Sequence, residues 1–165
     1  MNLSGGIFRP GMRAYFVPLA AGLILAASAF LPWVIVDGES TAGFPDMWAL
    51  WVVGLGALAT VLALLSLITR RNSRHPLLVV GLCALAIMFL SWRILPRLAG
   101  QRAQTVSQAA AIVENRPLDA APATDAGIGI YLGLAASAVI VLFGLTIVVK
   151  RASRTYVLTS PDDDV

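Results

Sequence analysis

Four long apolar stretches dominate the pattern of hydrophobic and polar positions, at residues 15–36, 47–69, 76–95 and 126–149. The only charged residue within them is Arg93, near the end of the third stretch. About 20 helical residues cross a hydrocarbon core, so each stretch is long enough to span a membrane. Lipid offers no partners to open backbone groups, and no stretch alternates in polarity as a barrel strand would. The pattern therefore predicts an all-α integral membrane four-helix bundle.

The basic residues predict how these helices are oriented. Eight of the twelve lie at one end of the predicted bundle: Arg9, Arg13, Arg70, Arg71, Arg74, Lys150, Arg151 and Arg154. The other end has Arg93, Arg97, Arg102 and Arg116, together with six acidic residues. Because short cytoplasmic loops are enriched in Lys and Arg, both termini are predicted to be cytoplasmic.

The connection between the first two stretches, residues 37–46, is predicted to be a short outer turn. Glycine and proline on both sides of it break helices. Tryptophan is concentrated at this end of the bundle, at Trp33, Trp48, Trp51 and Trp92. An indole ring with one polar N–H suits the headgroup region, so these residues predict an aromatic belt. The alternative is an outer-leaflet pocket for a flat apolar ligand such as a quinone, a carotenoid or a lipid tail.

The first 29 residues leave a second interpretation open. Basic residues, an apolar run and Ala27-Ser28-Ala29 resemble a secretory signal with an A-x-A cleavage site. Cleavage there would leave three spans. The apolar run continues past that site to Val36, which favours a full membrane span.

Residues 97–125 form the only sizeable part outside the predicted membrane. The stretch RLAGQRAQTVSQAAAIVEN is rich in helix formers. Small apolar residues recur in it at spacings of four and three and form a narrow stripe: Ala99, Ala103, Val106, Ala110 and Val113. The prediction is a weakly amphipathic outer helix that prolongs the third span or lies over the outer surface, followed by an extended strap after Pro117. Such a helix is either a solvated spacer or a partner-docking element.

Small residues inside the stretches predict where helices pack together. The fourth stretch has Gly129, Gly133 and Ser137 at intervals of four, a GxxxG-type stripe for close helix contact. Gly22 in the first stretch and Gly56 in the second have the same expected role. In lipid there is little hydrophobic force between helices, so such stripes and dispersion contacts hold a bundle together.

Composition supports a membrane protein. The 165 residues are 58% hydrophobic and 13% charged, with a mean hydropathy of +0.82, and a soluble domain needs more charge on its surface. The net charge of +3 is small and the basic residues lie beside apolar runs, which argues against nucleic-acid binding. Eleven of the twelve basic residues are arginine and alanine is abundant, a bias typical of GC-rich bacterial genomes. The predicted location is the bacterial cytoplasmic (inner) membrane.

The chain lacks the residue pairs that membrane enzymes and carriers need. His75 is a lone histidine at a membrane edge, so a haem held by two histidines is excluded. Cys83 is a lone cysteine, so an internal disulfide is excluded. No carboxylate lies within the predicted spans, and the intramembrane serines have no base beside them. Arg93 is close enough to the boundary for its side chain to reach the headgroups. The prediction is no enzyme activity, no metal, and no cofactor beyond a bound lipid, quinone or carotenoid.

Three fragments, FLPW, GLGALATVLALLSL and GIGIYLGLAASAVIVLFG, resemble a group of small four-span bacterial membrane proteins. The resemblance covers the four spans but neither the outer segment nor the tail. It implies a topology and brings no activity or functional residues with it.

These features together predict one domain over residues 1–154 and a disordered cytoplasmic tail at 155–165. The expected function is that of a non-catalytic accessory or scaffolding subunit of a larger membrane complex, such as an energy-transducing one. Its expected partners are membrane lipids and other integral membrane subunits. The alternative is a membrane protein that binds a lipid, quinone or carotenoid at the tryptophan cluster, and a small transporter or enzyme is the third option.

Overall fold

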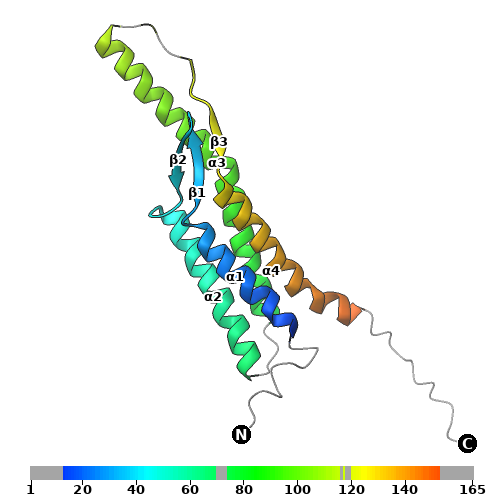
Figure 1. Ribbon diagram of the computed structural model, residues 1–165. Helices are drawn as coiled ribbons and strands as arrows, with labels where there is room; N and C mark the ends of the chain where they lie inside the picture. The colour runs from blue at the N-terminus through cyan, green and yellow to red at the C-terminus, as the bar shows by residue number, and fades with distance from the viewer. Residues whose placement is uncertain (1–12, 70–73, 116, 118–119, 153–165) are drawn as a thin grey trace, which may run out of the picture.

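A computed structural model describes residues 13–69, 74–115, 117 and 120–152. Most of these residues belong to four helices, which pack into a bundle (Figure 1): α1 (Phe16–Ser28), α2 (Met47–Thr69), α3 (Arg74–Glu114) and α4 (Ile128–Ala152). One turn of 3-10 helix, Arg13–Tyr15, precedes α1. The predicted tail at 155–165 and the basic residues Arg9, Arg70, Arg71 and Arg154 lie outside the described residues, as do the side chains of Lys150 and Arg151.

A small antiparallel sheet covers one end of the bundle. Its three strands are β1 (Pro32–Val36), β2 (Glu39–Ala42) and β3 (Thr124–Ala126), in the order β2-β1-β3. The sheet lies beyond the end of α1 and beside α3 (Figure 1). The mainly helical architecture predicted from the sequence is confirmed, whereas the prediction of an all-α fold is wrong at this sheet.

Within the described residues, three helices are long and apolar enough to cross a membrane, as expected of a membrane protein: α2, the first part of α3, and α4. The first stretch differs from its prediction. Its helix α1 ends at Ser28 after 13 residues, about 20 Å at 1.5 Å per residue, and the stretch continues as β1. The run predicted as one helix over 15–36 is therefore part helix and part strand.

The sheet forms because Asp37 and Gly38 make a tight turn between β1 and β2. Both residues have positive φ, 49° and 87°, which is the geometry of a type I′ hairpin turn and the reason that Asp-Gly is favoured there. Val36 then pairs with Glu39 across the turn. The segment predicted as a simple outer turn is a β-hairpin, and its Asp-Gly pair was the sequence signal for it.

Asp37 also holds the chain that returns from α3. Its backbone N–H donates to the carbonyl oxygen of Ala123, and its carboxylate accepts a hydrogen bond from the N–H of Ala123, both at 3.0 Å. The strap predicted as extended thus ends as a strand, because β3 pairs antiparallel with β1 directly after this contact.

Helix α3 projects far beyond the other helices (Figure 1). Its 41 residues correspond to about 60 Å, roughly twice the thickness of a hydrocarbon core. Of the two arrangements predicted for the outer segment, the structure has the helix that prolongs the third span. The helix ends at Glu114, and Asn115, with a φ of 51°, adopts the left-handed conformation common after a helix C-terminus.

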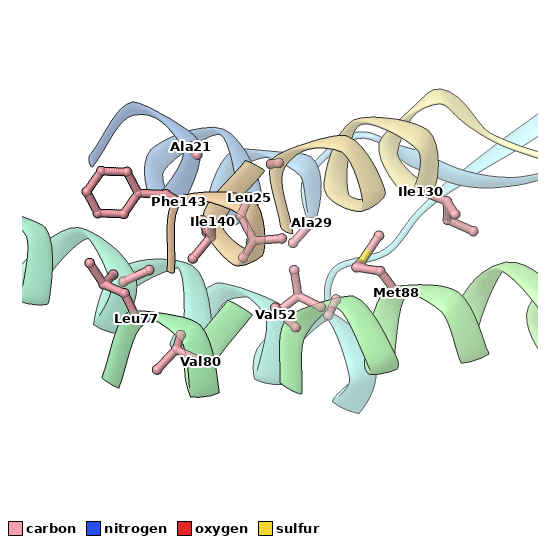
Figure 2. Close-up of a cluster of buried hydrophobic side chains, with 14 of the residues drawn as sticks. Ala21, Leu25, Ala29, Val52, Leu77, Val80, Met88, Ile130, Ile140 and Phe143 are labelled. Carbon is pink, nitrogen blue, oxygen red and sulfur yellow. The ribbon is translucent and has the colours of Figure 1, made fainter. Parts of the chain in front are cut away.

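Apolar side chains from all four helices meet inside the bundle. Figure 2 shows this cluster, in which Leu25 of α1, Val52 of α2, Met88 of α3 and Ile140 of α4 are fully buried. Among the described residues, the side-chain polar groups buried in the bundle are serine hydroxyls, the indole N–H of Trp33 and the hydroxyl of Tyr15. Tyr15, before α1, adds an edge-to-face ring contact with Phe143 of α4 at a centroid distance of 5.2 Å.

Helices α1 and α2 approach each other at Gly22 and Gly56. A Cβ atom placed on Gly56 would lie 2.7 Å from the backbone nitrogen of Ala26 and 2.8 Å from the carbonyl oxygen of Gly22. A Cβ on Gly22 would lie 2.6 Å from Oγ1 of Thr60. Gly54, two residues earlier in α2, has no atom within 4 Å of its Cβ position. The two glycines of α2 therefore provide a matched pair, one between backbones and one on the outer surface.

We predict that Gly56→Ala destabilises the protein by about 1–3 kcal/mol, because backbone atoms on α1 cannot move aside as a side chain could. Gly54→Ala should be neutral or stabilise by up to about 1 kcal/mol, since alanine is the better helix former. Unfolding of the purified variants in one detergent, followed by circular dichroism, measures the difference. Equal stabilities would contradict the close approach of α1 and α2.

Candidate functional site

The four tryptophans occupy different environments. Trp33 is buried, with 2% of its surface exposed, whereas Trp48, Trp51 and Trp92 are 47%, 59% and 36% exposed. Trp33, Trp48 and Trp92 line three different pockets. The structure therefore does not bring the predicted tryptophan residues together around one ligand site.

Trp33 is a packing residue at the end of α1. Its indole Nε1–H donates to the backbone carbonyl of Ser28 at 2.9 Å. That carbonyl ends α1 and also accepts a hydrogen bond from the backbone N–H of Leu31 at 3.3 Å. Two glycines make room for the ring, because a Cβ on Gly43 would overlap the indole and one on Gly129 would lie 2.7 Å from its Cδ1. This residue therefore does not belong to an exposed aromatic belt.

The packing glycines and serine predicted for α4 all face the bundle interior. A Cβ on Gly129 would meet the carbonyl oxygens of Ser28 and Pro32, and one on Gly133 would meet the side chain of Met88. Ser137 is buried, and its hydroxyl donates to the carbonyl of Leu134 at 2.9 Å. The stripe thus lies against α1, the start of β1 and α3.

An open cavity of about 260 Å³ lies beside Trp33 under the β-hairpin. Thr41, Asp46 and Leu95 are among its lining residues, so its wall is part polar and part apolar. Thr41 already donates its hydroxyl to the carbonyl of Val34 at 3.2 Å. Nothing in this cavity marks a particular ligand.

A smaller apolar pocket of about 130 Å³ lies between the start of α2 and the face of α3 that bears Ser91. It is lined by Trp48, Leu90, Ser91, Ile94, Leu95 and Leu98. Ser91 is 4% exposed, and among the described residues its Oγ is the only buried side-chain polar atom without a hydrogen-bond partner. The other buried serines, Ser28, Ser66 and Ser137, each donate to a backbone carbonyl.

An unpartnered buried hydroxyl costs about 1–3 kcal/mol, so a polar group delivered into this pocket would be stabilised by it. The apolar lining and the indole of Trp48 suit the body of a lipid or ring ligand. Of the four tryptophans predicted for a ligand site, Trp48 is the one that lines this apolar pocket with the unpartnered hydroxyl of Ser91. Ser91 could not be recognised from the sequence, because a serine in a helix normally bonds its own backbone.

A third site surrounds the arginine that ends the apolar part of α3. Arg93 is exposed, and its guanidinium carbon lies 6.0 Å from the centre of the Trp92 ring. Trp92 in turn lies 5.8 Å from the ring of Phe89, centroid to centroid. The side chain of Arg93 is thus directed along the bundle surface and not into its core.

The projecting part of α3 has two unlike faces. One faces the returning chain, since a Cβ on Gly100 would lie 3.2 Å from the Cγ2 atom of Thr124. The rest of its circumference is uncovered: Val106 and Val113, two turns apart on one side, are 69% and 85% exposed, and Ile112, about 100° round the helix from Val113, is 82% exposed. We refer to these three residues as the aliphatic face of α3.

The predicted docking stripe is divided between these two faces. Its alanines, Ala99, Ala103 and Ala110, are half-buried, whereas Val106 and Val113 are exposed. Ile112 lies outside the predicted stripe but belongs to the aliphatic face. The periodic pattern predicted five residues on one side of a helix, and the structure leaves only the two valines of this stripe largely exposed.

An apolar groove of about 520 Å³ runs between α1 and α4. Alanines form part of its lining, at Ala20, Ala21, Ala135 and Ala136, with larger aliphatic residues such as Ile24 and Val139. Cys83 is also exposed, on α3, so it lies on the outside of the bundle and does not fill the interior. Within the described ranges, no group of three or more His, Cys, Asp or Glu residues could hold a metal ion.

No protein-family model matches this chain, and neither a curated protein nor a solved structure matches it. Inference about function therefore rests on the surfaces and pockets described above.

We predict that Trp33→Phe destabilises the protein by about 1–3 kcal/mol, because it removes the shorter of the two hydrogen bonds to the carbonyl of Ser28 and leaves a cavity. Trp51→Phe is the matched control, since Trp51 is largely exposed, and it should change stability by less than about 0.5 kcal/mol. Denaturant unfolding in detergent measures both. Comparable losses would show that burial of Trp33 does not hold the end of α1.

Proposed function

We propose that this protein is a non-catalytic accessory subunit of a bacterial cytoplasmic membrane complex, and that it docks a partner protein on the aliphatic face of α3. The observation that supports this is the exposure of Val106, Ile112 and Val113 on the part of α3 that projects beyond its apolar, membrane-compatible stretch. Val106 lies 13 residues beyond Arg93, which is about 20 Å along the helix. Ile112 and Val113 lie still farther from the hydrocarbon boundary.

An apolar face in water favours a partner that removes it from water. Burial of one such aliphatic side chain is worth about 1.5–3 kcal/mol, so Val106 and Val113 on one side of the helix, together with Ile112 on the adjoining side, could anchor a small interface. Exposed polar residues on the same helix, Arg102 and Thr105, provide a rim. The partner expected from this chemistry is the extramembrane part of another subunit, with an apolar groove for one helix.

The proposed arrangement has four spans with both termini in the cytoplasm. Helix α1 is short, but its outward residues Phe16, Leu23 and Ile24 are exposed and apolar, as lipid-facing residues are. The distribution of basic residues supports the orientation. In this arrangement the sheet and the projecting part of α3 lie on the outer side of the membrane.

A second candidate function is ligand binding at the pocket beside Trp48. The unpartnered hydroxyl of Ser91 favours it, because a quinone carbonyl or a lipid ester could accept a hydrogen bond there. This protein would then be found alone, with an extractable pigment, quinone or lipid.

The topology is tested with single cysteines in a Cys83→Ala background, at Ser40, Asn72 and Ala120. Ser40 and Ala120 are exposed on the sheet side of the bundle, and Asn72 is in the connection between α2 and α3, outside the described residues. An impermeant thiol reagent is expected to label positions 40 and 120 in whole cells, and position 72 only after the membrane is opened. Labelling of position 72 in intact cells would refute the orientation.

Docking is tested with the double variant Val106→Asp/Val113→Asp. Two charges on the aliphatic face should reduce copurification of a stoichiometric partner by tenfold or more, because each carboxylate would have to be buried unpaired. Gln104→Asp adds the same kind of charge at an exposed polar position on the side of the helix opposite Val106, outside the rim, and should leave the partner bound. Quantitative mass spectrometry of the protein purified in mild detergent gives both ratios.

The same purification separates the two candidate functions. An unchanged partner ratio in the Val106→Asp/Val113→Asp variant would exclude docking on the aliphatic face. A protein that purifies alone and carries an extractable quinone or pigment would support the pocket beside Trp48.

A further inference from the structure

Two arginines of α3 share a pocket at the edge of the predicted membrane. Arg93 and Arg97 lie one helical turn apart and line a cavity of about 260 Å³. The rest of its wall comes from three elements, with Trp92 from α3, Thr124 and Asp125 from β3, and Tyr131 from α4. The sheet is what brings these residues together, because β3 is held against β1 beside α3.

The charges of this pocket favour an anion. Both arginines are exposed, and within the described part of the chain neither forms an ion pair with a carboxylate. Asp125 lines the same cavity and offsets one positive charge, which leaves one in excess. A guanidinium group offers a planar fork of donors that matches the oxygens of a phosphate.

The position of the pocket along α3, at the end of its apolar stretch, favours a lipid as the ligand. Arg93 is the first charged residue after a run of 18 uncharged positions in α3, 75–92, about 27 Å of helix and close to the thickness of a hydrocarbon core. Trp92 and Tyr131 combine an apolar ring with one polar group, as residues at the headgroup level do. Phe89, 52% exposed and one turn deeper, offers an apolar surface to an acyl chain.

We propose that the pocket between Arg93, Arg97 and Tyr131 binds the phosphate of an anionic membrane phospholipid, whose acyl chains lie along α3 beside Phe89. The excess positive charge favours an anionic lipid over a zwitterionic one. This site does not depend on the proposed partner, because it lies on the β3 side of α3, away from the aliphatic face. It would fix the depth of α3 in the bilayer and hence the position of its projecting part.

The test uses the delipidated full chain in detergent, titrated with dioleoylphosphatidylglycerol. Binding is followed by native mass spectrometry and by the rise in melting temperature. Arg93→Gln/Arg97→Gln is expected to weaken binding about tenfold or more, since it removes two charge-assisted contacts. Arg102→Gln, an exposed arginine outside the pocket, should bind as the unmodified chain does.

Three further binding measurements distinguish an anionic lipid from other ligands. Dioleoylphosphatidylcholine should bind several-fold more weakly, and inorganic phosphate should give no stabilisation at millimolar concentration, because it lacks acyl chains. Arg93→Lys/Arg97→Lys keeps the charge without the planar fork of donors and should show intermediate affinity, which also provides a result if the glutamine pair fails to fold.

Equal affinity of the lysine or glutamine pair and the unmodified chain would overturn the proposal. Equal stabilisation by inorganic phosphate would replace the lipid with a free anion and overturn it as well.

Discussion

The hydrogen bond from the indole of Trp33 to the carbonyl of Ser28 lies where α1 stops and the sheet begins. A helix that ends among apolar residues leaves carbonyl groups without donors, and each such group is costly when no water can reach it. Here the neighbouring carbonyls are also satisfied, since Ala29 accepts from Phe44, Leu31 accepts from Gly43 and Trp33 accepts from Gly127. The return of the hairpin and the approach to α4 therefore complete the end of α1.

Several other features depend on this junction. The ring of Trp33 needs glycine at positions 43 and 129, so the hairpin and the first turn of α4 can approach it. The sheet allows a 13-residue helix to be the first element of a bundle whose other helices are 23 residues or longer. Without the hairpin, the polar backbone of residues 29–33 would be left in apolar surroundings.

The sheet also divides the surface of α3 into regions with different chemistry. On one side, β3 and the chain before it lie along the helix and place Thr124 and Asp125 beside the arginine pair. On the other side, the aliphatic face stays uncovered. A lipid contact and a protein contact can thus occupy the same helix at different levels and on different faces. In the proposed arrangement, the aliphatic face of α3 lies at a fixed height above the bilayer.

The amino-acid sequence alone determined the long apolar helices. Lipid demands an uncharged run with internal backbone hydrogen bonds, so charge-free length was sufficient to place α2 at residues 47–69 and the apolar part of α3 up to Arg93. The hairpin was also encoded locally, by Asp37-Gly38, but the apolar strand before it has the composition of a membrane helix. Helix and strand could not be told apart there from hydrophobicity alone.

Only the tertiary structure decided which side of each element is covered. Trp33 and Trp48 are alike in type and in apparent depth, yet one is buried because glycines from two distant segments meet its ring, and the other lines an open pocket. The unpartnered hydroxyl of Ser91 and the pocket of Arg93, Arg97 and Tyr131 follow from the same cause. Periodicity along a chain shows which residues share a face, but the element that covers that face comes from elsewhere in the sequence. The returning chain is held beside α3, with Thr124 next to Gly100, by the hydrogen bonds between Asp37 and Ala123, a contact between residues 86 positions apart.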